Sequence, residues 1–595
     1  MWKQLGKETN MTDTEKRKPI RISDIIWYIL WILPAGLRVW LGVITGSWLN
    51  EAEVYDDVLM IRYAQFSEYF LAGKGKDVML KELGMPLILQ IVKTSRLPYA
   101  AFTSLLWVLS AALIARIICQ ISKNRYAAFF PYLFVLFTPA AFEKLCGTRI
   151  YRASLQTPMY IVVFALEVIL LLKFLSFRDE RLSGKGMLVI SILLGILFSL
   201  TYFIKEDGMW ILAVLLMFLL FWIIAAAIGF RAIRKRKKTG ICVLSILLPF
   251  LIFFGSILVC KGVNRHYFDV WETNTRTSGQ TGRFIEYLYK TGSPDRTNTI
   301  WIPKDVIEQV FASSATLSAH PELKEAIYTS PWLEGDIDEN PIYGDRFTWI
   351  IKDAVFDENI VSTQKEKEDF FRKVNEELAE AFRSGKLSSD KDRIQLIASI
   401  GGKNRTELLY VAKMALFNYQ HHLLLNDYEI GARIRPIKDN EIYEAACDLT
   451  NTDLDPREAG EKLDRRKARI ETANRIINGL FALYRVLNLV FCIFGALGLI
   501  RAIVLLIRNR KKSLDWTALF CALTGLAMGA VSYVYSYMVM LFCTQFPERF
   551  LLAEKMYSVG LISLLVMFIA LGISLLFRST GTPAATDDGA LNETK

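Results

Sequence analysis

The sequence has few of the residues that build metal centres and disulfide-linked domains. Its 595 residues include four histidines and eight cysteines, and none of their spacings matches a zinc site. Only Cys146 and Cys447 lie clear of the long apolar segments, which excludes a disulfide-built domain. We do not expect these two residues to pair, we expect no cofactor, and no motif indicates a divalent metal.

A cleavable signal peptide and an internal repeat are missing as well. The apolar run after Ile25 is long and no small-residue cleavage pattern follows it, so we expect it to remain as a signal anchor. At 53% hydrophobic the chain exceeds a typical soluble protein, but its mean hydropathy of +0.29 is too low for a chain that lies wholly in lipid. These values predict a membrane protein with a large water-exposed part.

Ten segments reach the roughly 20 apolar residues that a membrane-spanning helix needs. They are Ile25–Ile44, Tyr99–Ile118, Tyr126–Phe142, Leu155–Phe174, Met187–Phe203, Met209–Ile228, Ile241–Cys260, Leu483–Leu506, Trp516–Met538 and Met556–Phe577. Met85–Val92 is too short to span, and we expect it to form a helix at the membrane interface.

Lysine and arginine in the N-terminal tail and the short loops predict the orientation. With ten spans, all basic clusters fall on one face, which is the cytoplasmic face; they are Lys16–Arg21, Lys123 and Arg125, Arg178 and Arg181, Arg231–Lys238, and Arg508–Lys512. We therefore expect a multi-pass protein of the cell membrane with both termini in the cytoplasm. Much of the net charge of +11 reports this orientation, so no nucleic-acid partner is expected.

The fold class that follows is an α-helical polytopic membrane protein with one large insert. We expect a cytoplasmic tail (1–24), a first membrane part (25–260) whose outer loop (45–98) carries interfacial helices, an extracytoplasmic domain (261–480), a second membrane part (481–577) and a cytoplasmic tail (578–595).

The insert between the seventh and eighth spans is expected to be mainly helical. Lys365–Gly385 carries apolar residues at helical spacing, with Thr363 and Glu366 as a capping box and Gly385 as a C-terminal stop. The short run Thr299–Ile302 is typical of a strand.

An acid pair follows the first span. Asp56 and Asp57 come about a dozen residues past it, on the outer side, at the start of an amphipathic helix. An acid held there can accept a proton from a hydroxyl near the lipid surface. The alternative is that the pair caps a helix and is solvated.

Further charged residues are expected on the same face. They are Arg149 and Arg152 before a span, Lys205, Glu206 and Asp207 in a short turn, Glu548 and Arg549 before the last span, and Arg38 near the outer end of the first span. Cations at this depth suit a phosphate anchored in the outer leaflet. The alternative is that they snorkel and fix the depth of their helices; Arg38 either snorkels or lines the same cavity.

The stretch Tyr55–Ala64, followed by Lys81–Leu87, resembles the first outer loop of GT-C glycosyltransferases, which are multi-pass enzymes that use polyprenyl-phosphate-linked sugars. That family places an acid or an acid pair after the first span, and interfacial helices after it. The resemblance continues through Arg149-Ile-Tyr-Arg, Lys205–Trp210 and Glu548-Arg-Phe, and the text around Asp345 is similar to uncharacterised bacterial members. Many members carry their soluble domain at the C-terminus, unlike this chain, and the Trp-Trp-Asp signature of oligosaccharyltransferases is missing.

The resemblance implies direct, inverting transfer of a hexose or pentose from polyprenyl phosphate to a cell-envelope glycan or a lipid-linked acceptor. In that mechanism Asp56 takes the acceptor proton and Asp57 orients the reactants, or the two exchange roles. The implied donor-phosphate ligands are Arg149, Arg152, Lys205 and Arg549. The implied supporting residues are Tyr55, Tyr151, Glu206, Asp207, Glu548 and Arg38.

Two other classes of function stay open. A transporter or flippase for lipid-linked sugars would carry charges within its spans and would have broken helices, whereas here the charges cluster at one face. A non-catalytic receptor or scaffold would bind its partner through the insert, and the sequence is compatible with that function too.

Overall fold

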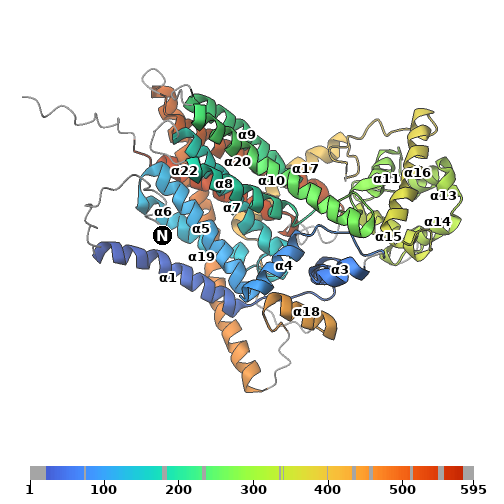
Figure 1. Ribbon diagram of the computed structural model, residues 1–595, viewed down its shortest axis with the longest axis horizontal. Coiled ribbons are helices and arrows are strands. Elements are labelled where there is room, and N and C mark those ends of the chain that lie inside the picture. Colours follow the sequence, from blue (N-terminus) through green and yellow to red (C-terminus); the bar gives the residue numbers. More distant parts are fainter. Residues whose placement is uncertain are drawn as a thin grey trace, which may run out of the picture.

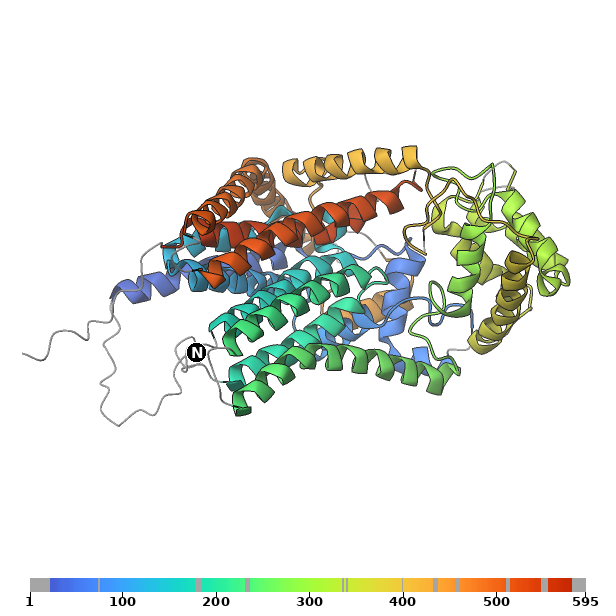
Figure 2. The same ribbon diagram turned by 90° about the horizontal axis from the view of Figure 1, so that it is seen from above.

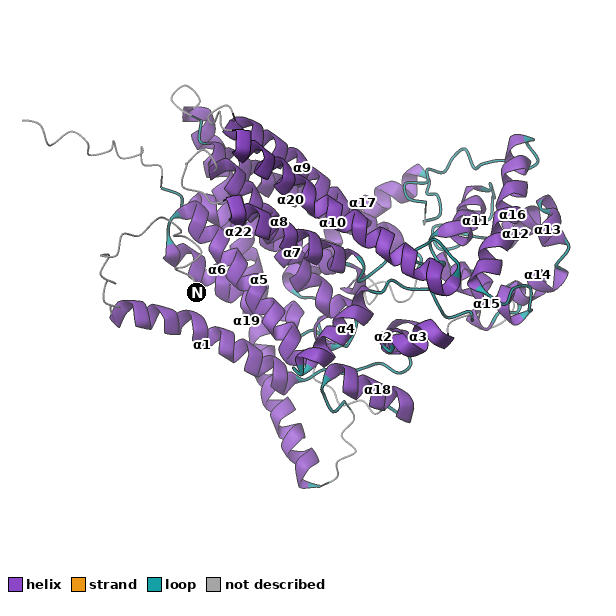
Figure 3. Cartoon of the chain, viewed as in Figure 1, coloured by secondary structure: helices purple, strands orange, loops and turns teal. Residues whose placement is uncertain are grey.

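The computed structural model describes residues 22–72, 75–176, 184–230, 236–333, 337–338, 341–398, 400–431, 437–454, 460–509, 514–546 and 555–579. Within these ranges every regular element is a helix, as Figure 3 shows. Extended segments there make only isolated bridges, such as that between Ile300 and Tyr343. The strand expected at Thr299–Ile302 is therefore not formed, because a single bridge is all that its backbone makes.

Nine helices in the described ranges are long and apolar enough to cross a membrane. They are α1 (Ile22–Thr45), α5 (Tyr99–Ser122), α7 (Arg152–Ser176), α8 (Gly184–Tyr202), α9 (Met209–Phe230), α10 (Arg236–Phe268), α19 (Glu461–Asn509), α20 (Trp516–Cys543) and α22 (Val559–Leu576). Their outward faces keep large apolar side chains exposed, among them Leu216, Leu251 and Ile493, which suits contact with lipid rather than water. The chain is a helical multi-pass membrane protein.

The expected span Tyr126–Phe142 does not form one long helix. It contains α6 (Arg125–Leu136), whose 12 residues give about 18 Å, short of the roughly 30 Å of a bilayer core. The helix ends before Thr138 because the residue that precedes a proline, here Pro139, is pushed out of the α region. The chain continues as η3 (Pro139–Ala141) and η4 (Lys144–Thr148) to the start of α7. Helix α6 packs along α5, so the chain turns back after α5 and again before α7.

The insert has its own helical core and lies at one end of the membrane helices, opposite the start of α1 (Figures 1 and 2). Its helices are α11 (Gly279–Lys290), α12 (Lys304–Ser313), α13 (Ala315–Ser318), α14 (Pro321–Tyr328), α15 (Phe347–Asp357) and α16 (Gln364–Arg383), with the short turns η5 (Pro331–Leu333) and η6 (Gly344–Arg346). Phe284, Trp301, Ile350 and Phe371 are fully buried among them. The expectation of a mainly helical insert is confirmed.

The start and end of α16 follow the sequence prediction. The Thr363 hydroxyl accepts the Glu366 N–H, and the Glu366 carboxylate accepts the Ser362 N–H. Gly385 has a φ of +77° just past the last turn, a conformation that glycine adopts without strain.

Two helices of the segment 261–480 pack on the membrane part. Helix α17 (Arg405–Leu424) lies along α19 and α20, and Asn418 donates to the hydroxyls of Ser536 and Ser558. Helix α18 (Asn440–Thr450) packs on α2 and α4. The segment 261–480 therefore contacts the membrane part through both α17 and α18.

The loop after α1 forms short helices that pack beside these elements. They are η2 (Val54–Val58), α2 (Leu59–Ala64), α3 (Phe66–Ala72) and α4 (Gly84–Ser95). The expected helix at Met85–Val92 is thus present within α4, and it buries Met85, Ile88, Leu89 and Val92 along one stripe. A Cβ at Gly84 would overlap the main chain of Phe203, so only glycine lets the start of α4 lie against the end of α8.

Candidate functional site

Five buried or half-buried charged side chains meet where the insert adjoins the membrane helices, and we call them the charge cluster. They come from η2, the loop before α4, the first residue of α7, the turn between α8 and α9, and the insert: Asp56, Lys81, Arg152, Glu206 and Arg276. The three cations and two carboxylates leave one positive charge in excess.

Asp56 is the carboxylate of the expected acid pair that faces the charge cluster. Its Oδ1 accepts hydrogen bonds from Lys81 Nζ at 3.2 Å and Arg152 Nη2 at 2.7 Å, and its side chain is 27% exposed. Burial alone would raise the pKa of Asp56, but Lys81 and Arg152 outweigh burial and hold it well below its usual range. Asp56 is therefore ionised and already bound to two cations.

Asp57 points away from Asp56 into the protein. It is 0% exposed, accepts the Asn50 N–H at 2.8 Å, and accepts Arg149 Nε and Nη2 at 2.9 and 2.7 Å. Burial raises the pKa of Asp57 to about 6, and the hydrogen bonds from Arg149 limit that rise, so the carboxylate stays ionised at neutral pH. Asp57 and Arg149 are bound to each other, and both side chains are almost closed to solvent.

Arg152 is the central cation of the charge cluster. It donates through Nη1 to Glu206 at 2.7 Å and through Nη2 to Asp56, and its guanidinium lies over the Tyr151 ring. Glu206 also lies 3.6 Å from both Lys81 and Arg276. These three cations overcome burial and hold the pKa of Glu206 well below its usual range.

Burial acts on Lys81 in the opposite direction. It lowers the pKa of Lys81 to about 8, helped by the positive charge of Arg152 and opposed by Glu206 and Asp56. Lys81 is 4% exposed, so it is a cation that loses its proton more easily than a surface lysine.

Lys205 lies beside the charge cluster with an incomplete set of partners. Its Nζ is 3.1 Å from Asp207 Oδ2 and 4.1 Å from the centre of the Tyr557 ring. The contact with Asp207 lacks hydrogen-bond alignment, and Nζ makes no hydrogen bond to any described residue. A buried ammonium with unused donors is suited to an anionic group of a ligand.

The insert supplies groups that the sequence analysis did not assign to the site. Trp349 of α15 lies under two cations, with the guanidinium carbon of Arg276 4.6 Å and Lys81 Nζ 5.1 Å from its ring centre. Its ring also lies 4.7 Å from that of Tyr55. Arg276 in turn lies 3.8 Å from Asp345. In the sequence, the one signal for these residues of the insert is the group of aromatic and charged residues around Asp345 in an otherwise polar segment.

Three expected site residues are not among these contacts. Arg38 is held inside the helices by the Ser104 hydroxyl at 3.0 Å and the Phe142 ring at 4.4 Å. Glu548 and Arg549 lie outside the described residues. In the described ranges no group of three or more His, Cys, Asp or Glu side chains is arranged to hold a metal ion.

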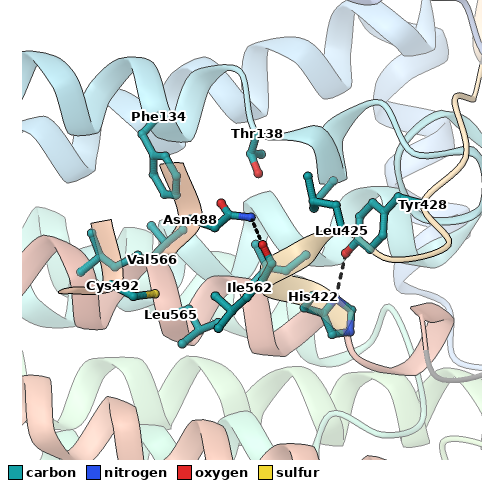
Figure 4. A pocket seen from close by; sticks show the side chains of 13 residues that line it. Phe134, Thr138, His422, Leu425, Tyr428, Asn488, Cys492, Ile562, Leu565 and Val566 are labelled. Atoms are coloured by element: carbon teal, nitrogen blue, oxygen red, sulfur yellow. Dashed lines mark hydrogen bonds between the residues drawn. The ribbon is translucent and has the colours of Figure 1, made fainter. Parts of the chain in front are cut away.

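A separate, mostly apolar pocket lies among α6, α17, α19 and α22 (Figure 4). Its polar edge carries Asn488, whose Nδ2 donates to the Leu423 carbonyl, and His422, which is 2.8 Å from the Tyr428 hydroxyl. Burial lowers the pKa of His422 to about 3, so it is a neutral packing residue. The cavity volume is about 40 Å³, the room of one or two water molecules, which is too small for a sugar or a prenyl chain.

Comparison of the chain with protein-family models, curated proteins and solved structures finds no match. The function must therefore be argued from the charge cluster and its surroundings.

Proposed function

We propose that the protein is an inverting glycosyltransferase that moves a sugar from a polyprenyl-phosphate donor to a hydroxyl of a cell-envelope glycan or lipid-linked acceptor at the outer face of the cell membrane. The observation that carries the proposal is the charge cluster, in which the half-exposed Asp56 lies between Lys81 and Arg152. A carboxylate held between buried cations, at the ends of membrane helices, suits a reaction that releases a membrane-anchored phosphate.

The proposed reaction is a single displacement. The acceptor oxygen attacks the anomeric carbon, the bond from that carbon to the phosphate oxygen breaks, and the electron pair leaves with polyprenyl phosphate. The hydroxyl proton passes to a carboxylate of the site. Lys81, Arg152 and Lys205 balance the charge that develops on the leaving phosphate.

Asp57 has a different part in this proposal. Asp57 is fully buried and forms a two-point ion pair with Arg149, so we propose that it positions η2 and Arg149. Asp56 is then the carboxylate that contacts the substrate. Arg149 then acts through Asp57 and through the Tyr151 ring, which lies 4.6 Å from its guanidinium carbon.

Transport of a lipid-linked sugar is the alternative, and one described helix carries a residue that suits it. A charged group within a span is a common mark of transport. Glu167, in the middle of α7, is fully buried and its carboxyl oxygens have no hydrogen-bond partner in the described ranges. It stands apart from the ion pairs of the charge cluster, which lie at helix ends.

The test uses the full-length protein in liposomes with polyprenyl-phosphate sugars that carry a radiolabelled hexose or pentose. We expect the wild type to release polyprenyl phosphate and to transfer the label to a host envelope fraction, or slowly to water. Asp56→Asn should lower the rate at least about 100-fold, because it removes the carboxylate that orders Lys81 and Arg152.

The matched control is Asp369→Asn, which alters an exposed ion pair on α16 with Lys365 and Arg372 and should keep the wild-type rate. Full transfer by Asp56→Asn would refute the proposed site. Passage of intact donor across the bilayer without cleavage would instead establish the transport alternative.

A further inference from the structure

A second carboxylate, Asp345, enters the site from the insert without a close partner. Its Oδ2 lies 3.8 Å from Arg276 Nη1, the one ion pair within 4 Å that it makes among the described residues. Its side chain is 27% exposed, as is that of Asp56. The hydrogen bonds that Asp345 makes to other described residues involve its main chain, so no other described residue donates a hydrogen bond to its carboxylate.

The backbone of Asp345 is fixed to the membrane part. Its N–H donates to Gln545 Oε1 at 2.8 Å, just past the end of α20, and its carbonyl accepts the Thr348 hydroxyl at 2.9 Å. Gly344 has a φ of +55°, and a Cβ there would overlap the Gln545 side chain. These contacts place the Asp345 carboxylate at a defined position in the joint between insert and membrane helices.

The carboxylates of Asp56 and Asp345 differ in how readily they can accept a proton. Asp56 Oδ1 already accepts hydrogen bonds from Lys81 and Arg152. These cations hold the pKa of Asp56 well below the usual range, which makes Asp56 a weak proton acceptor. Burial raises the pKa of Asp345, and Arg276 and Lys81 offset the rise only in part. Two carboxyl groups whose pKa values are pushed apart in one site commonly have different roles.

We propose that Asp345 takes the proton from the attacking hydroxyl, while Asp56 stays ionised and holds Lys81 and Arg152 toward the leaving phosphate. This inference rests on the proposed function and deepens it, because it assigns the proton to a residue of the insert. It also gives the insert a catalytic part.

The step balances with groups at the site. The acceptor oxygen forms its bond to the anomeric carbon as its proton moves to an Asp345 oxygen, and the carbon–oxygen bond to the phosphate breaks with its electron pair on polyprenyl phosphate. Asp345 then returns the proton to water. The charged and titratable groups that act on Asp345 or lie within its field are Arg276, Lys81, Asp56, Tyr289 and Tyr557.

The experiment measures release of labelled sugar to water, so that no acceptor has to be known. The full-length protein in liposomes is given undecaprenyl-phosphate-linked hexose, and the rate is followed from pH 4.5 to 8. We expect the wild-type rate to fall as the pH drops and Asp345 gains a proton. Asp345→Asn should be at least about 100-fold slower, should have an almost unchanged KM, and should lose the fall at acid pH.

Two further variants separate catalysis from folding. Asp345→Ala leaves room for a small carboxylate, and sodium formate should restore part of its rate, whereas Asp369→Asn should be indistinguishable from the wild type. Thermal unfolding identifies any variant that fails to fold.

The outcomes keep this inference distinct from the proposed function. If the wild type cleaves no donor, the proposed function fails. If the wild type cleaves donor but Asp345→Asn keeps both its rate and its pH profile, the assignment of the proton to Asp345 is overturned. A slow Asp345→Ala that formate does not restore, with an acid limb that persists, assigns Asp345 a structural role and also overturns the inference.

Discussion

Asp57 and Arg149 form a forked ion pair that is closed to solvent, with Arg149 Nη2 2.7 Å from Asp57 Oδ1 and Nε 2.9 Å from Oδ2. Their side chains are 0% and 2% exposed. The pair connects η2 to the segment just before α7, and Arg152 is the first residue of α7. The position of Asp56 relative to Arg152 thus depends on a neighbour that does not itself face the charge cluster.

Breaking this pair should destabilise the protein strongly. Asp57→Asn leaves the Arg149 charge buried without its counter-ion, and we expect a loss of about 3–5 kcal/mol of unfolding free energy. Equilibrium unfolding of the full-length protein in detergent measures it. The control is Asp338→Asn, at an exposed pair with Lys304, which should cost at most about 1 kcal/mol. Equal costs at the two positions would contradict the structural role of Asp57.

Replacing the central guanidinium by an ammonium should impair transfer even though the charge is kept. Arg152 uses two nitrogens to reach Asp56 and Glu206 at once, and a lysine has one nitrogen. We expect Arg152→Lys to transfer sugar at least about 10-fold more slowly, with unfolding changed less than by Asp57→Asn. A wild-type rate in Arg152→Lys would show that the two-way bridge is not needed.

The stability of the protein should fall as the pH rises from about 5 to about 7. Burial raises the pKa of Glu82 to about 7, so between its ordinary pKa and this value the folded state binds a proton that the unfolded state has lost. Asp57, with a pKa raised to about 6, acts in the same direction. His422, with a lowered pKa, acts in the opposite direction.

Glu82→Gln isolates the contribution of Glu82. Glu82 Oε1 accepts from Asn274 and Thr273, and Oε2 has no partner among the described residues, so a neutral amide can keep the accepted hydrogen bonds. We expect the unfolding free energy of the variant to fall less than that of the wild type between pH 5 and 7, by a difference of about 1–3 kcal/mol. Parallel curves for the two proteins would disprove the assignment.

A methyl group at position 84 should disturb the site from a distance. In Gly84→Ala the new Cβ meets the main chain of Phe203, so α4 or the turn at Lys205 has to move, at a cost of about 1–3 kcal/mol. Gly75→Ala, where a Cβ would meet nothing within 4 Å, is the control. Because Lys81 and Lys205 flank the contact, Gly84→Ala should also slow transfer; unchanged stability and rate would refute the close contact.

The sequence predicts the long helices well, because a run of about 20 apolar residues has few other stable states in lipid. It predicts the α16 cap and the α4 helix for similarly local reasons. It fails at Tyr126–Phe142, where composition alone is suited to a span but Pro139 ends the helix early. It also fails at Thr299–Ile302, because pairing of a short extended run depends on residues far away in the chain.

Only part of the candidate site can be predicted from the sequence. Asp56 and Glu206 follow apolar spans and Arg152 precedes one, so a shared face can be predicted for them. The different contacts of Asp56 and Asp57 cannot be predicted, because they depend on the direction that each side chain takes from η2. Arg276 and Asp345 could not be assigned to the site from the sequence either, since only the packing of the insert on the membrane part brings Arg276 beside Glu206 and Asp345 beside Gln545.

The most direct test of the account is the stoichiometry of donor cleavage by the wild-type protein in liposomes. Labelled undecaprenyl-phosphate-linked hexose is supplied, and undecaprenyl phosphate and the transferred or freed sugar are both quantified. The account predicts equal amounts of the two products, with the anomeric configuration of the sugar inverted. Donor that stays intact, or a sugar whose configuration is retained, would contradict it.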